Sequence, residues 1–258
     1  MKIGVSTACL YPEETEKALR RLCEIGIGNF EIFFNADCEL RGEIYEDIRR
    51  IIRESGSGVI SVHPYTSAVE TMSLFGNYKR RYADIMETYK RYFEIMNELG
   101  ARIFVLHGAL KSADCPEKLY FERYTALYEL GKTFGVTVAQ ENVSYCRSGS
   151  LDFLRQMKKQ LGDECKFVLD VKQAIRSGIS PFDILKVLGN SIVHCHISDN
   201  TAEKDCVAVG KGRLDFEEFA DSLKKEDYKG DIVLELYRNG FKELNELKES
   251  VRYMEGFF

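Results

Sequence analysis

The sequence predicts an α/β protein, a single (β/α)8 barrel, also called a TIM barrel, formed by its 258 residues. Short apolar runs, typical of buried parallel strands, alternate with segments of helical periodicity along the chain. This alternation occurs eight times, which is the number of units in a closed barrel. No segment rich in Pro, Gly or Ser divides the series, so we expect one domain over residues 1–258.

The first four units each combine an apolar run with an amphipathic segment. Strands are expected at residues 3–9, 30–35, 59–65 and 103–109, and helices at 12–25, 44–55, 77–99 and 116–134. Pro12 stands at the start of the first helix and Gly26 at its end. Gly100 ends the third helix, whose broad aromatic and aliphatic face is typical of a core helix.

The last four units follow the same pattern with shorter helices. Strands are expected at residues 136–143, 167–171, 192–198 and 232–237, and helices at 151–161, 181–188, 216–223 and 241–254. Ser150 and Ser180 stand where the N-caps of two of these helices are expected. Because buried parallel strands must be covered on both faces, the series favours a closed sheet with helices outside.

Composition limits the class of function. Apolar residues make up 45% and charged residues 30%, which is typical of a soluble globular protein without a membrane span. The net charge of -5 disfavours broad nucleic-acid binding, which needs a basic surface. The 8 cysteines include none at CxxC spacing, and several lie in expected helices or strands, which favours reduced thiols. The amino terminus enters a strand without a long apolar segment, so we expect a cytoplasmic protein.

Six ionisable side chains stand at the carboxyl ends of expected strands. They are His63, His107, Glu141, Asp170, His196 and Glu235. Each alone has an ordinary structural interpretation, as a helix cap or a hydrogen-bonded core residue. In a barrel, however, these ends meet at the mouth where active sites lie. Three acids there would repel one another unless a cation compensates them, and we expect one divalent metal ion: Mn, Co, Mg or Zn.

Such a site has a definite chemistry. An open, oxygen-rich metal site can chelate adjacent carbonyl and hydroxyl groups and stabilise the enediolate formed when a carbon-bound proton leaves. One nearby carboxylate can take that proton and a second can return it. This chemistry is that of sugar isomerisation or epimerisation.

The strand ends carry motifs that resemble a known family. They are SVHPY around His63, VLHGA around His107, AQENV around Glu141, FVLDVKQA around Asp170, HCHISDN around His196, IVLELYR around Glu235 and the GKG of Gly210–Gly212. Together they resemble the xylose-isomerase-like barrel superfamily of sugar phosphate isomerases and epimerases. The resemblance to its ketose 3-epimerases implies that one metal is held by Glu141, Asp170, His196 and Glu235. It also implies that Glu141 and Glu235 are the catalytic acid/base pair.

Two positions depart from relatives. The family often has His three residues after the strand-six Asp, where this chain has Gln173; an amide can bind a hydroxyl but cannot carry a proton. The endonuclease IV relatives place Asp-x-His before the glycine motif, where this chain has Asp205-Cys206-Val207. A trinuclear zinc site and DNA cleavage are therefore not expected, and His63 and His107 are predicted to bind substrate hydroxyls or to line the mouth.

Further residues are candidates for substrate binding. Lys172, Lys211 and Arg147 are expected in loops near the mouth, where they would hold a phosphate or carboxylate, although loop cations are by default solvated. Phe33 is expected either to line the pocket or to pack in the core. Asn142 would orient its neighbouring glutamate or start a loop. His194 is expected behind His196 rather than as a ligand.

The first hypothesis is a metal-dependent sugar isomerase or ketose epimerase acting on a small sugar or polyol, phosphorylated or not. A close alternative is a lyase of the inosose dehydratase kind, which forms the same enediolate and expels water. A non-catalytic sugar-binding barrel is a second class, favoured by Gln173. A nuclease is a third and is opposed by the acidic charge. The sequence does not determine the oligomeric state, and a homo-oligomer is one option.

Overall fold

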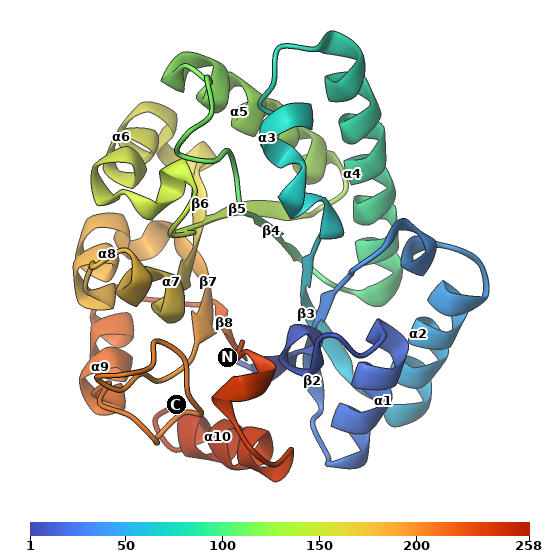
Figure 1. Cartoon of the computed structure of the whole chain (residues 1–258), viewed down its shortest axis with the longest axis vertical. Coiled ribbons are helices and arrows are strands. Elements are labelled where there is room, and N and C mark those ends of the chain that lie inside the picture. The colour runs from blue at the N-terminus through green and yellow to red at the C-terminus, as the bar shows by residue number, and fades with distance from the viewer.

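Eight parallel strands form the centre of the chain and close into a barrel in sequence order. The computed structural model describes the backbone of residues 1–258 and every side chain except that of residue 68. β8 pairs with β1, which closes the sheet, and helices surround the strands (Figure 1). The prediction of a (β/α)8 barrel is confirmed.

The strands end earlier than their apolar runs suggest. They are β1 Ile3–Ser6, β2 Asn29–Phe33, β3 Gly58–His63, β4 Ile103–Leu106, β5 Thr137–Glu141, β6 Lys166–Asp170, β7 Ile192–Ile197 and β8 Asp231–Leu234. β1 shows the reason. The Ser6 side chain accepts a hydrogen bond from Ala8 N (3.3 Å) and starts a 3-10 turn, so Cys9 and Leu10 are buried outside the strand. An apolar run indicates buried positions. Here the chain stays buried beyond the last hydrogen bond that joins the strand to its neighbours.

The helices follow the predicted order, with two additions. They are α1 Thr15–Glu24, α2 Gly42–Ser55, α3 Glu70–Ser73, α4 Lys79–Leu99, α5 Glu117–Thr133, α6 Leu151–Leu161, α7 Val171–Arg176, α8 Pro181–Leu188, α9 Phe216–Lys225 and α10 Asn245–Glu255. Ser150 and Ser180 cap α6 and α8 as predicted, accepting from Phe153 N and Phe182 N. The short helices α3 and α7 were not predicted, because four to six residues hold too little periodicity.

Placing Lys172 in a loop was wrong. α7 begins directly after β6, because the Asp170 side chain accepts a hydrogen bond from Gln173 N (2.7 Å) and caps the helix. Lys172 and Gln173 therefore lie in the first turn of α7, next to the carboxyl end of β6. This helix start holds both side chains in fixed positions relative to Asp170.

The barrel interior changes character along its axis. Val105, Ala139 and Val168 form a small apolar cluster inside it. Nearer the carboxyl ends the interior is polar: Glu31, Ser61 and His194 are all fully buried. The main core lies instead between the strands and the outer helices. The carboxyl mouth therefore rests on a layer of buried hydrogen-bonding groups, which is the layer that carries the site.

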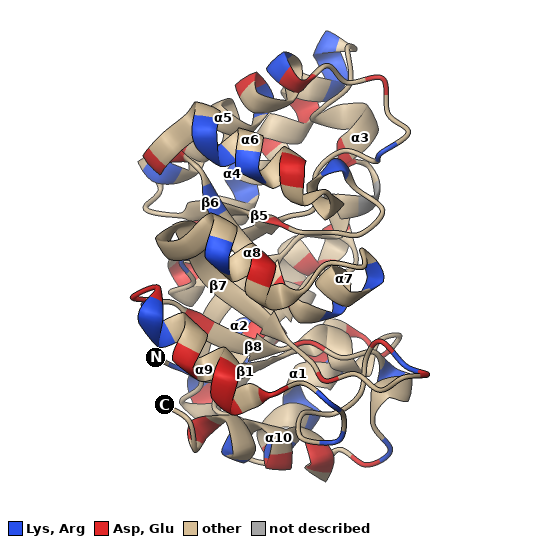
Figure 2. Cartoon of the chain, turned by 90° about the vertical axis from the view of Figure 1, so that its left-hand side faces the viewer, with Lys and Arg blue, Asp and Glu red and all other residues tan. Residues whose placement is uncertain are grey.

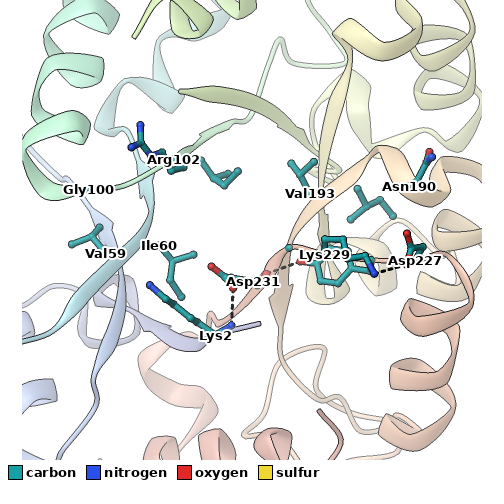
Figure 3. A pocket seen from close by; sticks show the side chains of 14 residues that line it. Lys2, Val59, Ile60, Gly100, Arg102, Asn190, Val193, Asp227, Lys229 and Asp231 are labelled. Carbon is teal, nitrogen blue, oxygen red and sulfur yellow. Dashed lines mark hydrogen bonds and ion pairs between the residues drawn. The ribbon is translucent and has the colours of Figure 1, made fainter. Parts of the chain in front are cut away.

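The opposite mouth also holds a cavity, of about 530 Å³, and Figure 3 shows it. Asp231, Lys229 and Asp227, three of its charged residues, have local partners. Asp231 Oδ1 accepts from Lys2 N (2.6 Å), and Lys229 forms an ion pair with Asp227 (2.5 Å). Since chemistry in TIM barrels takes place at the carboxyl ends of the strands, we infer that the residues at this opposite mouth contribute to the stability of the fold.

The outer surface is mixed in charge. Figure 2 shows Lys and Arg interspersed with Asp and Glu over the helices of the face in view. Many of these charges pair along one helix, as Arg50 does with Asp47 (2.7 Å). Within the part of the chain that is described, none of the helices combines the length and the apolar character needed to cross a bilayer.

Candidate metal and substrate site

Four strand ends bring Glu141, Asp170, His196 and Glu235 to one point. Glu141 and Asp170 are the last residues of β5 and β6, and Glu235 directly follows β8. Parallel register places Asp170 beside His196 of β7. One oxygen or nitrogen from each of the four side chains lies within 4.8 Å of those of the other three. Such a group of atoms is compact enough to share one ion.

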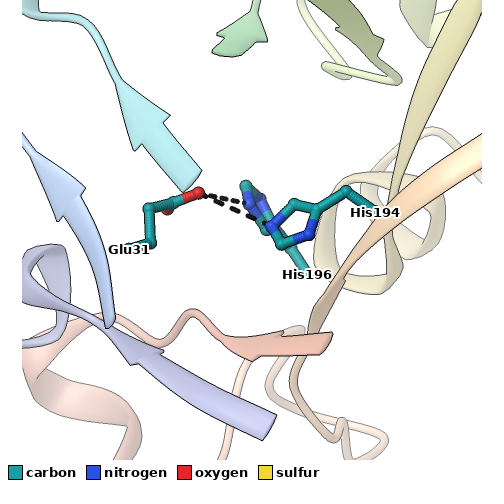
Figure 4. Close-up of side chains that lie close together, drawn as sticks. All are labelled: Glu31, His194 and His196. Carbon is teal, nitrogen blue, oxygen red and sulfur yellow. Dashed lines mark hydrogen bonds and ion pairs between the residues drawn. The ribbon is translucent and has the colours of Figure 1, made fainter. Parts of the chain in front are cut away.

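The His196 ring separates this group from the barrel interior. Its Nδ1 faces the three carboxylates, at 3.1 Å from Glu235 Oε2, 3.6 Å from Glu141 Oε1 and 3.7 Å from Asp170 Oδ2. Its Nε2 faces the other way and lies 2.9 Å from Glu31 Oε2, as Figure 4 shows. When Nε2–H donates to Glu31, the lone pair of Nδ1 points at the carboxylates.

The donor atoms fit a divalent cation. His196 Nδ1 and Glu141 Oε2 are buried and make no well-directed hydrogen bond to the described residues, although they lie 3.1 Å from Glu235 Oε2 and 3.0 Å from His107 Nε2. Buried polar atoms without a directed hydrogen bond are costly, and a cation between them would satisfy both. Three carboxylates and one imidazole suit Mn, Mg, Co or Zn, as predicted from the strand ends. Glu141, Asp170, His196 and Glu235 are the residues that would hold it.

Glu31 is a site residue that the sequence analysis missed. It lies in β2 and is fully buried, and its Oε2 also accepts from Ser61 Oγ (2.8 Å). Burial alone would raise the pKa of Glu31, but His196 and His194 hold it well below its ordinary value. A charged residue inside the apolar run Asn29–Phe33 was the signal that could have found it.

Without a cation, the carboxylates act on the imidazole. Burial would lower the pKa of His196, yet Glu31 and Glu235 raise it well above the ordinary value. For the acid Asp170, burial has the opposite effect and raises the pKa. The carboxylates thus favour the protonated imidazole, and a bound divalent ion would compete with that proton.

Lys172 lies inside the cluster rather than at the rim. Its Nζ is 2.9 Å from Asp170 Oδ2 and 2.8 Å from Glu235 Oε2. Only 4% of its side chain is exposed, so these two carboxylates are its main electrostatic environment. Burial would lower the pKa of Lys172, but Asp170 and Glu235 raise it well above the ordinary value.

The two strand-end histidines form a pair. His63 Nε2 lies 2.7 Å from His107 Nε2, which in turn is 3.0 Å from Glu141 Oε2. Burial lowers the pKa of His63, whereas Glu141 outweighs burial and raises the pKa of His107. His63 is fully buried and stacks on Phe33 at 4.1 Å between ring centroids. His107 is the one that reaches the cavity.

A cavity of about 260 Å³ lies over the cluster. Its lining includes the polar side chains of His107, Glu141, Lys172, Gln173 and Glu235. The rest of the wall is mainly aromatic and apolar, and comprises Ala8, Tyr11, Phe33, Asn35, Tyr145, Leu236 and Tyr237. Phe33 therefore lines the pocket, the first of its two expected positions. The tyrosines come from loops and were not found by periodicity.

Two predicted substrate ligands lie elsewhere. The Arg147 guanidinium donates to Cys115 O and pairs with Glu117 at 3.7 Å, on a separate surface depression beside α6. Lys211 is exposed in the loop after β7. The structure does not bring either residue into the cavity wall described above, and their contact with a substrate stays a prediction.

Loop residues next to the ligands hold the strand ends in place. Asn142 bonds to both backbone groups of Asp170, with Nδ2 donating to O (2.9 Å) and Oδ1 accepting from N (2.7 Å). It therefore ties β5 to β6. Gln173 Oε1 accepts from Ser144 N (3.0 Å), which anchors the loop after β5. The Asp199 carboxylate accepts a hydrogen bond from Gly212 N (2.7 Å). A Cβ at position 212 would overlap this carboxylate.

The fold and the cluster define a TIM-barrel protein with a compact carboxylate and imidazole centre at its carboxyl mouth. The family model described as xylose isomerase-like TIM barrel matches residues 19–257. The chain belongs to this family, so the resemblance found in the motifs is confirmed.

Its relatives include sugar epimerases. A 3-dehydro-D-guloside 4-epimerase from Escherichia coli (strain K12) is 22% identical over 260 residues, which cover 91% of this chain and 92% of that protein. A solved D-tagatose 3-epimerase-like protein superposes with a TM-score of 0.80 at 18% identity, covering 100% and 97% of the two chains. The IolI protein, solved with a zinc atom, gives 0.74 at 18% identity, covering 100% and 96%.

Proposed function

We propose that this protein is a divalent-metal-dependent sugar epimerase or isomerase whose metal is held by Glu141, Asp170, His196 and Glu235. The observation that carries the proposal is the convergence of four donor atoms within 4.8 Å below a cavity. Two buried atoms of this set make no well-directed hydrogen bond to the described residues, which a cation between them would compensate. A sugar epimerase among the relatives, and the zinc atom in the solved IolI protein, support it.

The two glutamates divide the proton transfer. When bound, the metal would polarise a substrate carbonyl and lower the cost of the enediolate. Glu141 ends β5, Glu235 directly follows β8 and both line the cavity, so a sugar bound there would have a carboxylate from each of two strand ends beside it. One takes the carbon-bound proton and the other returns it. Gln173 and His107 would bind the neighbouring hydroxyls.

The cavity wall favours a sugar without a phosphate. Among the described residues that line it, Lys172 is the only Lys or Arg, and two carboxylates already neutralise it. A phosphate ester there would bring two negative charges to a site that already holds three acids. Phe33 and the three tyrosines offer instead the flat apolar faces that suit the carbon-bound hydrogens of a sugar ring.

The first test is isotope exchange. Metal-loaded protein in deuterium oxide is incubated with ketoses, keto-glycosides and their phosphate esters, and products are read by NMR and mass spectrometry. We expect deuterium at a carbon next to the carbonyl in an unphosphorylated sugar, with the substrate composition otherwise unchanged. Loss of water would indicate a lyase. Binding without exchange would indicate a non-catalytic barrel and would contradict the proposal.

The second test removes one proton carrier. Glu235→Gln keeps the size of the side chain and abolishes its basicity, so we expect turnover to fall by about 10²-fold or more. Circular dichroism should remain that of the wild type. The matched control is Glu217→Gln on the exposed face of α9, which should keep full turnover. Unchanged turnover of Glu235→Gln would remove the proposed mechanism.

A further inference from the structure

Lys172 donates to the same oxygens that would bind the metal. Its Nζ contacts Asp170 Oδ2 (2.9 Å) and Glu235 Oε2 (2.8 Å). These two atoms are also the ones that face His196 Nδ1, at 3.7 and 3.1 Å. The ammonium group therefore holds half of the four-residue ligand set, from the side of the cavity.

The position of this ammonium is determined by its surroundings on several sides. Asp170 caps α7 through Gln173 N, which fixes the helix turn that carries Lys172. The Tyr237 ring lies 5.3 Å from Nζ and adds a cation–π contact. A buried lysine is tolerated only where carboxylates compensate it, and here both compensating groups belong to the ligand set.

We propose that Lys172 is a built-in competitor of the divalent ion, which keeps the ligands assembled without metal and weakens metal binding. This inference rests on the proposed function, because it concerns the same centre. For the ion to enter, Nζ must either leave the two oxygens or share them with it. In both cases a positive charge stays within a few ångströms of the ion in a buried environment, where repulsion is strong.

The released side chain has a place to go. Lys172 already lines the cavity, so an ammonium that leaves Asp170 and Glu235 enters the space that the sugar would occupy. A bound sugar hydroxyl can then accept from it. Metal loading would thus convert Lys172 from a partner of the ligands into a partner of the substrate, although of a hydroxyl rather than of the phosphate or carboxylate that the sequence predicted.

The test compares Mn²⁺ binding in three proteins by isothermal titration calorimetry, with free Mn²⁺ followed by electron paramagnetic resonance. The proteins are the wild type, Lys172→Met and the control Arg176→Met. Arg176 lies on α7 as well, but its guanidinium pairs with Asp205 and donates to Tyr237 OH (2.5 Å), and neither partner belongs to the four-residue ligand set. We expect Lys172→Met to bind Mn²⁺ about tenfold tighter or more, and Arg176→Met to stay within about twofold of the wild type.

Removal of the lysine leaves buried carboxylates without a counter-charge, so a second measurement guards against poor folding. Lys172→Gln retains an amide donor, and thermal unfolding of all variants is recorded with and without Mn²⁺. The metal should raise the unfolding temperature of Lys172→Met and Lys172→Gln by more than that of the wild type. This difference between paired measurements holds even where the metal-free variant is less stable.

The other outcomes are distinguishable. Equal Mn²⁺ affinity in the wild type and Lys172→Met would overturn the competition and leave the metal centre intact. Weaker binding by the variant would show that Lys172 positions the ligands for the ion, which also overturns it. If neither protein binds any of Mn²⁺, Co²⁺, Mg²⁺ or Zn²⁺, the proposed metal centre itself fails, and the inference fails with it.

Discussion

His196 can act as a metal ligand because its two ring nitrogens have different partners. Glu31 Oε2 lies 2.9 Å from Nε2, and Ser61 Oγ donates to the same oxygen (2.8 Å). Because His196 and His194 keep the pKa of Glu31 low despite burial, Glu31 stays ionised, accepts a hydrogen bond from Nε2–H and leaves Nδ1 free for a metal. A carboxylate behind a metal-binding histidine fixes both the tautomer and the ring orientation.

The prediction at this scale concerns Glu31→Gln. The amide is neutral and can donate to Nε2, which would put the proton on Nδ1, so we expect metal affinity to fall by about 10- to 100-fold. Calorimetry with Mn²⁺ measures it. Ser61→Ala loses only the hydroxyl that donates to the same Glu31 oxygen, so it should lower metal affinity less. Equal affinity of Glu31→Gln and wild type would show that Glu31 does not orient His196.

Among the elements, the short helix α3 supports the loop that carries His107. Glu70 Oε2 accepts from Gly108 N (2.6 Å), directly after His107, and its Oε1 lies 3.4 Å from Tyr89 OH of α4. Gly108 has φ +90°, and a Cβ there would overlap the Tyr120 hydroxyl, so this close turn requires glycine. Burial raises the pKa of Glu70 from 4.5 to about 7.

This shift predicts a pH dependence of stability. Since the folded-state pKa is raised, the contribution of Glu70 is fully present below pH 4.5 and is lost as the pH rises through about 7. Glu70→Gln keeps an oxygen acceptor for Gly108 N and has no titration. Between about pH 4 and about pH 8, the wild type should lose roughly 3 kcal/mol of unfolding free energy relative to this variant.

Urea unfolding at several pH values measures the difference between the two proteins. Glu94→Gln, on the exposed face of α4, is the matched control and should follow the wild type at every pH. Parallel stability curves for Glu70→Gln and the wild type would show that Glu70 is ionised alike in the folded and unfolded states.

For the whole molecule, a metal at this centre would cross-link four strands of the barrel, from β5 to β8. The ligands are far apart in the chain, and the unfolded chain does not hold them together. Metal should therefore stabilise the fold by mass action, by roughly 3 kcal/mol when its free concentration is about 100 times the dissociation constant. For a chain of this length we expect a rise in Tm of about 5–10 °C.

Thermal unfolding of chelator-treated protein, before and after addition of Mn²⁺, measures this rise. Asp170→Asn should lose it, while an asparagine still caps α7. Asp183→Asn, in the first turn of α8 and exposed, is the control and should retain the full rise. A wild type whose Tm does not respond to any of the four metals would argue against the centre.

The sequence by itself determined the barrel and the positions of its strand-end ionisable residues. Apolar runs and helical periodicity are local signals, and each run ends near the residue where its strand reaches the mouth. Six converging groups could therefore be named without coordinates, and the resemblance to the family selected four of them: Glu141, Asp170, His196 and Glu235. Closure into a barrel is the reason, because it brings every strand end to one rim.

The tertiary structure alone decided which partner each polar side chain meets. Glu31 and His196 are 165 residues apart, and Lys172 and Glu235 are 63 apart, so neither contact has a local signal. Loop paths likewise placed Tyr145 and Tyr237 in the cavity wall and Arg147 beside Cys115. Such contacts depend on how distant segments pack, and packing is a property of the folded chain rather than of any stretch of it.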